Sequence, residues 1–201
     1  MIRALRPATA ALALALAGCA SAPLHYYTLV APAGAAPAAG TSAPFQFALL
    51  PVVVPAQVDR PQLLVREGGQ GVRVLEDERW AAPLADEARA ALAADLAREL
   101  NAEDATGLPP GGKPRLRIKV ELRRFDSLPG GYALIDAAWS VSAPRGGAGA
   151  SCAGAVRESV GPGYDALVQG HQRALARLAG AIAATVRSVA GGHAPACAEL
   201  N

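Results

Sequence analysis

The stretch RLRIKVELRRF, residues Arg115–Phe125, decides the fold of this chain. Its apolar and charged side chains alternate, and this period of two predicts a β-strand with one buried face. The apolar face consists of Leu116, Ile118, Val120 and Leu122. Two more strand-like runs, Tyr132–Ala143 and Ser151–Val160, follow after turns rich in proline and glycine. We therefore expect an antiparallel meander of three strands.

Helical patterns lie on both sides of this meander. Residues Tyr164–Ala190 place a core-type side chain at every third or fourth position, and Gly191-Gly192 ends the pattern. Residues Trp80–Leu100 repeat leucine or alanine every fourth position, while charges of both signs occupy the other face. Such mixed charges are typical of a helix packed on a core, whereas a membrane-surface helix has a basic polar face.

The residues before the first helix add further strands. Phe45–Val54 is rich in valine, leucine and phenylalanine, and predicts a largely buried strand. Leu63–Arg66 and Val72–Leu75 lie on either side of a glycine-rich turn, which indicates a hairpin. The order of elements predicts an α+β fold, with a mixed, largely antiparallel sheet and two amphipathic helices packed on one face.

The first eighteen residues, Met1–Gly18, have the proportions of a secretory signal. Two arginines precede an apolar run that is too short to cross about 30 Å of hydrocarbon, which takes roughly 20 helical residues. The run ends in Leu16-Ala17-Gly18-Cys19, which resembles the lipobox of bacterial lipoproteins. We therefore expect cleavage after Gly18 and lipidation of Cys19, the alternative being an ordinary secretory signal with a chance cysteine.

Lipidation would define the organisation of the remaining chain. We expect a lipidated N-terminus and an Ala/Pro/Gly-rich tether over residues 19–44, a single globular domain over 45–192 and a tail over 193–201. The residues after Cys19 are Ala20 and Ser21 rather than aspartate. This favours the periplasmic face of the outer membrane in bacteria that use aspartate there to retain lipoproteins in the inner membrane.

Charge and composition exclude some classes of function. The chain of 201 residues carries 19 basic and 17 acidic residues, and the net charge of +2 lies in the signal segment. Such a balance argues against a general electrostatic nucleic-acid binder. A hydrophobic content of 52% argues against a wholly disordered chain.

Two cysteines remain after Cys19. Cys152 and Cys197 form an even pair in a chain expected to reach an oxidising compartment. They either form a disulfide or stay as two unpaired thiols. A metal site is not expected, because the cysteines and the three scattered histidines lack ligand spacing.

No motif points to catalysis or to a cofactor. Gly107–Lys113 satisfies G-x-x-x-x-G-K, but Pro114 replaces the Ser or Thr that would hold Mg²⁺, and the loop runs from helix to strand. His171 falls on the apolar stripe of a helix, which favours a packed core residue over a general base. Asp136 lies in a strand and favours a solvated or edge position over a catalytic one. We therefore expect no enzyme activity and no cofactor.

Several runs, in order, resemble one known family. They are Leu16–Cys19, Tyr26–Leu29, Pro51–Arg66, Arg79–Leu84 and Tyr164–Val168, with Trp139 in mid-strand. The chain looks like the PqiC family of membrane-integrity transporter lipoproteins, among the ABC-type transport auxiliary lipoproteins. The resemblance covers nearly the whole chain, and Asp59–Gln62 and Arg79–Leu84 are its most specific parts.

The resemblance implies a periplasmic α+β domain held at the outer membrane. It would work with an MCE-domain protein that forms a periplasm-spanning lipid tunnel and with an inner-membrane subunit, and it would dock the tunnel's far end. Ring-shaped MCE partners are compatible with a homo-oligomer, although nothing in the sequence fixes a number. Asp59, Arg60 and Pro61 are the candidate contact loop, the alternative being a structural turn capped by Asp59.

Two rival functions remain open from the sequence. The first is a lipid carrier with its own apolar cavity, which the alanine-rich helices disfavour because they predict tight packing. The second is a lipoprotein that activates or scaffolds a periplasmic cell-envelope enzyme. Trp80 and Pro83 are expected to fix the start of the first helix rather than to contact a partner.

Overall fold

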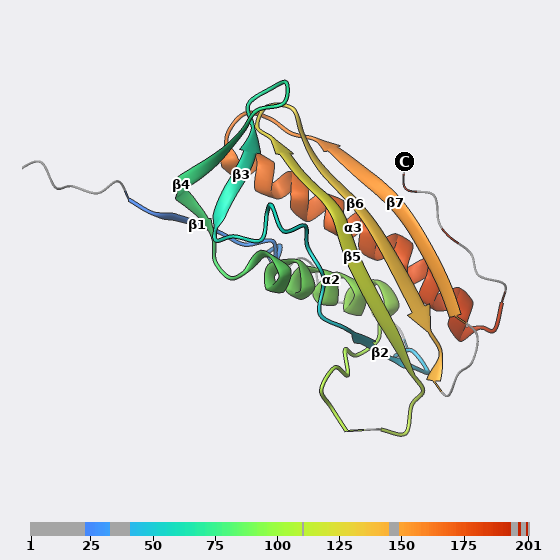
Figure 1. Ribbon diagram of the computed structural model, residues 1–201. Helices are drawn as coiled ribbons and strands as arrows, with labels where there is room; N and C mark the ends of the chain where they lie inside the picture. The colour runs from blue at the N-terminus through green and yellow to red at the C-terminus, as the bar shows by residue number, and fades with distance from the viewer. Residues whose placement is uncertain are drawn as a thin grey trace, which may run out of the picture.

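The fold is α+β, as the sequence predicts. The computed structural model describes residues 23–32, 41–109, 111–144 and 149–193, together with Cys197 and Leu200. In chain order the elements are β1 (His25–Tyr27), β2 (Gln46–Leu49), β3 (Gln62–Arg66), β4 (Val72–Trp80), α2 (Leu84–Leu100), β5 (Arg115–Leu128), β6 (Tyr132–Ser142), β7 (Gly149–Ser159) and α3 (Tyr164–Ala190) (Figure 1).

The strands are divided between two mixed sheets rather than joined in one. The larger sheet has the order β2-β5-β6-β7, in which β2 runs parallel to β5 and the other pairs are antiparallel. The smaller sheet has the order β1-β4-β3, in which β1 runs parallel to β4 and β3 is antiparallel to it. The predicted meander is the β5-β6-β7 part of the larger sheet.

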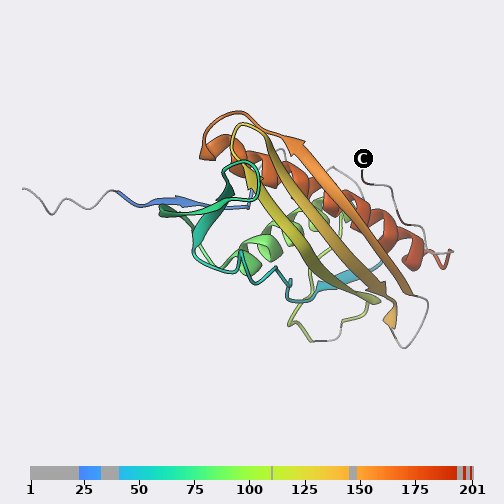
Figure 2. The ribbon, with the colours of Figure 1, turned by 45° about the horizontal axis from the view of Figure 1, so that its top comes forward.

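Both helices lie on the same side of the larger sheet (Figures 1 and 2). Helix α3 packs along β6 and β7, and α2 packs beside α3. The apolar stripes predicted for both helices are buried, and so are the apolar faces predicted for β5 and β6. These side chains belong to one hydrophobic core cluster, so the sequence periods identify the core correctly.

Strand β5 contains an irregularity that its alternation does not predict. Its register with β6 shifts between Leu122 and Arg124. A shift of this kind turns the following residues to the opposite face. Phe125, which continues the charged side by simple alternation, is therefore buried, and Asp126 and Ser127 are buried beside it.

Two predicted elements have different bounds in the structure. The strand expected over Phe45–Val54 is only β2, which ends where its parallel pairing with β5 ends at Leu49. Trp80 does not begin a helix, because β4 continues to it through backbone pairing with β1. Pro83 precedes α2 instead, and its carbonyl accepts hydrogen bonds from Asp86 N and Glu87 N.

Candidate functional site

A pocket brings together the two sequence runs that carry the most specific resemblance. It is lined by Asp59, Arg60, Pro61, Trp80, Ala81, Ala82 and Pro83, and its volume is about 290 Å³. Arg60 and Pro61 come from the loop before β3, and Trp80 comes from the end of β4. The site sits where the two strands of the hairpin come together, at the end remote from the hairpin turn.

Backbone hydrogen bonds fix the loop Pro55–Pro61. Val58 N donates to the Pro55 carbonyl over 3.0 Å, and Arg60 N donates to the Val58 carbonyl over 2.9 Å. The buried Val58 side chain holds the loop to the core. The Pro61 carbonyl accepts from Trp80 N over 2.8 Å, which ties the loop to β4. Backbone hydrogen bonds therefore hold the conformation of this turn.

The charged side chains of this loop are exposed. Asp59 and Arg60 both face solvent, and neither side chain has a hydrogen-bond or ion-pair partner within the part of the chain that the structure describes. Asp59 therefore does not cap the turn, although the backbone-closed turn and the solvated Arg60 agree with the structural alternative. An apolar pocket with one free carboxylate and one free guanidinium on its rim can receive an apolar side chain of a partner, while charged groups of that partner pair with the rim.

Trp80 forms the floor of the pocket and connects it to the core. Its side chain is buried, and its ring meets that of Phe125 edge to face at 6.0 Å between centroids. Phe125 in turn stacks on His171 at 3.9 Å. The pocket therefore rests on a rigid aromatic stack that links β4, β5 and α3.

The polar groups beneath this stack are closely paired. Asp126 accepts from Arg66 Nη2 at 3.1 and 3.2 Å and also pairs with Arg124. Burial acts to raise the pKa of Asp126, but the hydrogen bonds from the two arginines hold that pKa below its usual value. His171 Nε2 lies 2.8 Å from Ser127 Oγ, and complete burial lowers the pKa of His171 to about 3. His171 is thus a packed core residue, as its place on the helix stripe predicts.

The segment that follows β1 is bound to the helices beside the pocket. Glu87 Oε2 accepts from Thr28 Oγ1 at 2.7 Å and from Leu29 N at 2.8 Å. Gln172 Nε2 on α3 donates to the Thr28 carbonyl at 3.0 Å. Sequence reasoning placed Glu87 on the solvated face of its helix, and no local signal marks it because its partners are 58 and 59 residues away in the chain.

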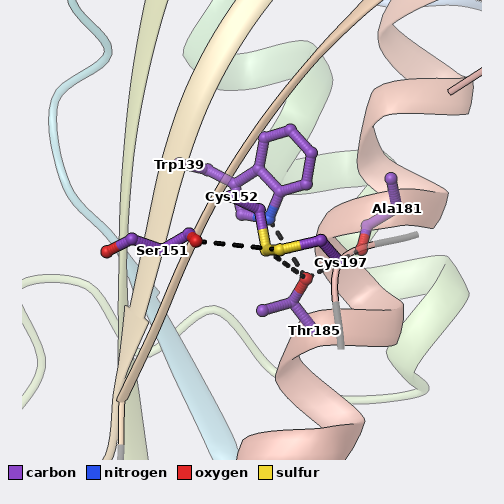
Figure 3. Close-up of a disulfide and its surroundings, with 6 residues drawn as sticks. All are labelled: Trp139, Ser151, Cys152, Ala181, Thr185 and Cys197. Atoms are coloured by element: carbon purple, nitrogen blue, oxygen red, sulfur yellow. Dashed lines mark hydrogen bonds between the residues drawn. A yellow bond between two sulfur atoms is a disulfide. The ribbon is translucent and has the colours of Figure 1, made fainter. Parts of the chain in front are cut away.

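A disulfide joins Cys152 on β7 to Cys197 (Figure 3). Cys152 is buried against α3, where its Sγ lies 3.8 Å from Thr185 Oγ1. The same hydroxyl oxygen accepts from Trp139 Nε1 at 3.1 Å. The bond therefore attaches Cys197 to the outer strand of the larger sheet.

The remaining predicted residues have simpler outcomes. Cys19 and the signal segment lie outside the described residues. Asp136 pairs with Arg123 across the two neighbouring strands. Among the described residues, no group of three or more His, Cys, Asp or Glu side chains could hold a metal ion. None of the described helices combines the length and the apolar character that crossing a bilayer requires.

Comparisons with known proteins show one family by sequence and a shared fold by structure. The family model described as ABC-type transport auxiliary lipoprotein component matches residues 27–183, a range that includes every pocket residue. The crystal structure of an uncharacterized protein is similar with a TM-score of 0.64 and 18% identity, over 82% of this chain and 99% of that chain. A Xanthomonas campestris protein assigned to the DUF330 family is similar with a TM-score of 0.54 and 17% identity, over 69% and 81%. At such identities the likeness shows the fold alone. No curated protein is significantly similar in sequence.

Proposed function

Because the chain belongs to the family of ABC-type transport auxiliary lipoprotein components, we propose that it is the membrane-anchored docking subunit of an MCE-type, Pqi-like lipid transport system. In this role, acyl groups on Cys19 hold the domain at the periplasmic face of the outer membrane. The folded body receives the periplasm-spanning tunnel protein, which connects to an inner-membrane subunit. The system moves lipid between the membranes and supports envelope integrity.

The pocket at Asp59–Pro61 and Trp80–Pro83 is the observation that supports docking most strongly. It has an apolar floor, a rim with both signs of charge and a fixed backbone, which are features of a preformed recognition site. Its residues carry the runs that resemble the PqiC family most specifically. We therefore assign it as the contact with the tunnel protein.

The interior of the domain favours docking over carriage of lipid. At Gly170 on α3, an added Cβ would lie 2.2 Å from Val160 Cγ1 and 3.1 Å from Ala133 Cβ. At this point α3 lies so close to Ala133 on β6 and to Val160, directly after β7, that a side chain at position 170 would not fit without a shift. Alanine and glycine at this contact leave no room there for an acyl chain, whereas a carrier needs a wide apolar cavity between these layers.

Recovery of the partner from crosslinked envelopes tests the proposal. The acylated full-length protein should recover an MCE-domain protein, and Arg60→Glu and Ala81→Phe should each reduce the recovery severalfold. Arg117→Glu is the matched control, because Arg117 is an exposed arginine on β5 away from the pocket. It should recover the partner like the wild type.

Two outcomes would count against the proposal in different ways. Failure of the wild type to recover any MCE-domain protein would contradict the assigned partner. Equal recovery by wild type, Arg60→Glu and Ala81→Phe would keep the partner and contradict the assigned pocket.

A further inference from the structure

The folded body begins only a few residues after the expected lipid anchor. Pro23 is the first described residue after Cys19, and β1 begins at His25. Six residues span at most about 20 Å when fully extended. The sequence predicts a tether that extends to Pro44. The free tether is shorter than that, because Tyr26–Leu29 is already bound to the body.

The attachment of this segment is firm. Residues His25, Tyr26 and Tyr27 pair with Glu78, Arg79 and Trp80 on β4, and the Tyr27 carbonyl accepts from Ala81 N at 2.8 Å. Leu29 is only 1% exposed. Together with the Glu87 hydrogen bonds, these contacts make residues 25–29 part of the folded body.

Two large apolar or aromatic side chains near the anchor face solvent, on either side of His25, which pairs with Glu78. Leu24 is 43% exposed and Tyr26 is 61% exposed, whereas Tyr27 points inward to the core. Leu24 and Tyr26 are two residues apart, so in an extended strand their side chains lie on the same face. Tyrosine is enriched where membranes meet water, because its ring is apolar and its hydroxyl is polar.

The neighbouring charges favour one kind of membrane surface. Arg79 pairs with Tyr26 in register, and the exposed Glu76 and Asp77 precede it on β4, where Glu76 Oε2 also accepts a hydrogen bond from Gln62 Nε2 on β3. A zwitterionic headgroup carries a phosphate that Arg79 can bind and an ammonium that the two carboxylates can bind. An anionic surface would be repelled by the carboxylates.

We propose that the exposed face of β1 lies on a zwitterionic phospholipid surface, with Leu24 and Tyr26 inserted at headgroup level. This inference rests on the lipidation of Cys19 proposed above, which brings the bilayer within reach. It assigns an orientation to the domain, in which β1, an edge strand of the smaller sheet, faces the membrane. The loop between α2 and β5, which holds Leu108, lies well apart from β1 in both views (Figures 1 and 2).

The cysteine content of the chain allows a direct test. Cys19 would be acylated and the other two cysteines form the disulfide, so a thiol introduced at position 26 can be labelled alone. The acylated Tyr26→Cys protein carries a nitroxide label and is reconstituted into vesicles of phosphatidylethanolamine and phosphatidylcholine. The measurement is the accessibility of the label to oxygen, which partitions into the bilayer, relative to a water-soluble nickel chelate.

A label at position 108 is the matched control, because Leu108 is 47% exposed and distant from β1. The ratio of oxygen to nickel accessibility should be severalfold higher at position 26 than at position 108. Addition of phosphatidylglycerol to the vesicles should lower the ratio at position 26. Wild-type protein should take up no label.

The outcomes separate this inference from the proposed function. Protein that does not float with the vesicles contradicts the anchor itself. Protein that floats but gives equal ratios at positions 26 and 108, or a label at position 26 shielded from both reagents, overturns the membrane contact. A ratio that is unaffected by phosphatidylglycerol overturns the preference for zwitterionic lipid.

Discussion

His171 on α3 and Ser127 on β5 form a buried hydrogen bond of 2.8 Å between Nε2 and Oγ. Phe125 covers the imidazole ring, and among the described residues His171 Nδ1 has no hydrogen-bond partner. Protonation of Nδ1 would place a charged donor in the core without an acceptor. The ring is therefore neutral, which is the physical reason for its pKa of about 3.

This arrangement predicts that acid destabilises the protein through His171. Below the ordinary histidine pKa of about 6.5, the unfolded chain binds a proton that the folded chain does not, so the free energy of unfolding falls as pH falls. The loss is at most about 1.4 kcal/mol per pH unit, in the window between about 6.5 and about 3. Asp126 is the charged group that opposes the effect, because it raises the pKa of His171.

Urea unfolding from about pH 7 to about pH 5 measures this slope, above the range in which most carboxylates titrate. His171→Gln keeps a donor for Ser127 but cannot titrate, so its stability should depend less on pH than that of the wild type. His193→Gln is the control, since His193 is exposed. Equal slopes in wild type and His171→Gln would contradict the account.

Glu87 predicts a second effect, on the segment next to the anchor. Glu87→Ala removes the acceptor for Thr28 Oγ1 and Leu29 N and leaves the buried Leu29 amide unpaired. We expect a loss of about 1.5–3 kcal/mol, the range for hydrogen bonds to charged groups. Amide hydrogen exchange of residues 25–30 should accelerate in this variant.

Asp86→Asn is the control for Glu87, because Asp86 lies in the same helical turn but is exposed. It should cost only the few tenths of a kcal/mol expected for a charge near a helix N-terminus. If exchange at residues 25–30 is as slow in Glu87→Ala as in Asp86→Asn, the segment is held by other contacts.

The disulfide predicts a third effect. Cys152 and Cys197 are separated by 45 positions, and a loop of this length corresponds to about 4 kcal/mol in the chain-entropy description. Cys197→Ala should lower the free energy of unfolding toward this extent without leaving a cavity, because Cys197 is exposed. A reductant should lower the thermal midpoint of the wild type and leave that of Cys197→Ala unchanged.

Intact mass provides the check on the bond itself. Reduction of the wild type should add the mass of two hydrogens, whereas Cys197→Ala should gain none. An unchanged mass for the wild type would mean that the two cysteines are not joined.

The periodicity of the sequence predicts the buried face of a helix or strand, because that face depends only on residues close together in the chain. The alternation of Arg115–Phe125 and the stripe of Tyr164–Ala190 identify buried faces because each is set by the geometry of one element. Local periodicity does not predict which distant segments pair as neighbouring strands. The short β2 and the extension of β4 to Trp80 both depend on parallel partners far away in the chain.

In the candidate site, too, the sequence predicts single segments but not the contacts between them. The exposed loop of Asp59, Arg60 and Pro61 was identified from sequence, but its closeness to Trp80–Pro83 follows from the pairing of β3 with β4. The carboxylates of Glu87 and Asp95 were expected on a solvated face and are buried. Residues Thr28 and Leu29 cover α2 at Glu87. At Asp95, burial raises the pKa of the carboxyl group, although the hydrogen bond and charge of Arg98 oppose this shift.

The central claim is that acyl groups on Cys19 hold this domain at a bilayer surface. Mass spectrometry of the N-terminal peptide from the native protein tests it most directly, with Cys19→Ala as the comparison. The account predicts a peptide that begins at Cys19 and carries acyl mass, and an uncleaved Cys19→Ala protein retained in the inner membrane. A free thiol at Cys19 in the native protein, or a Cys19→Ala protein that still fractionates with the outer membrane, would contradict it.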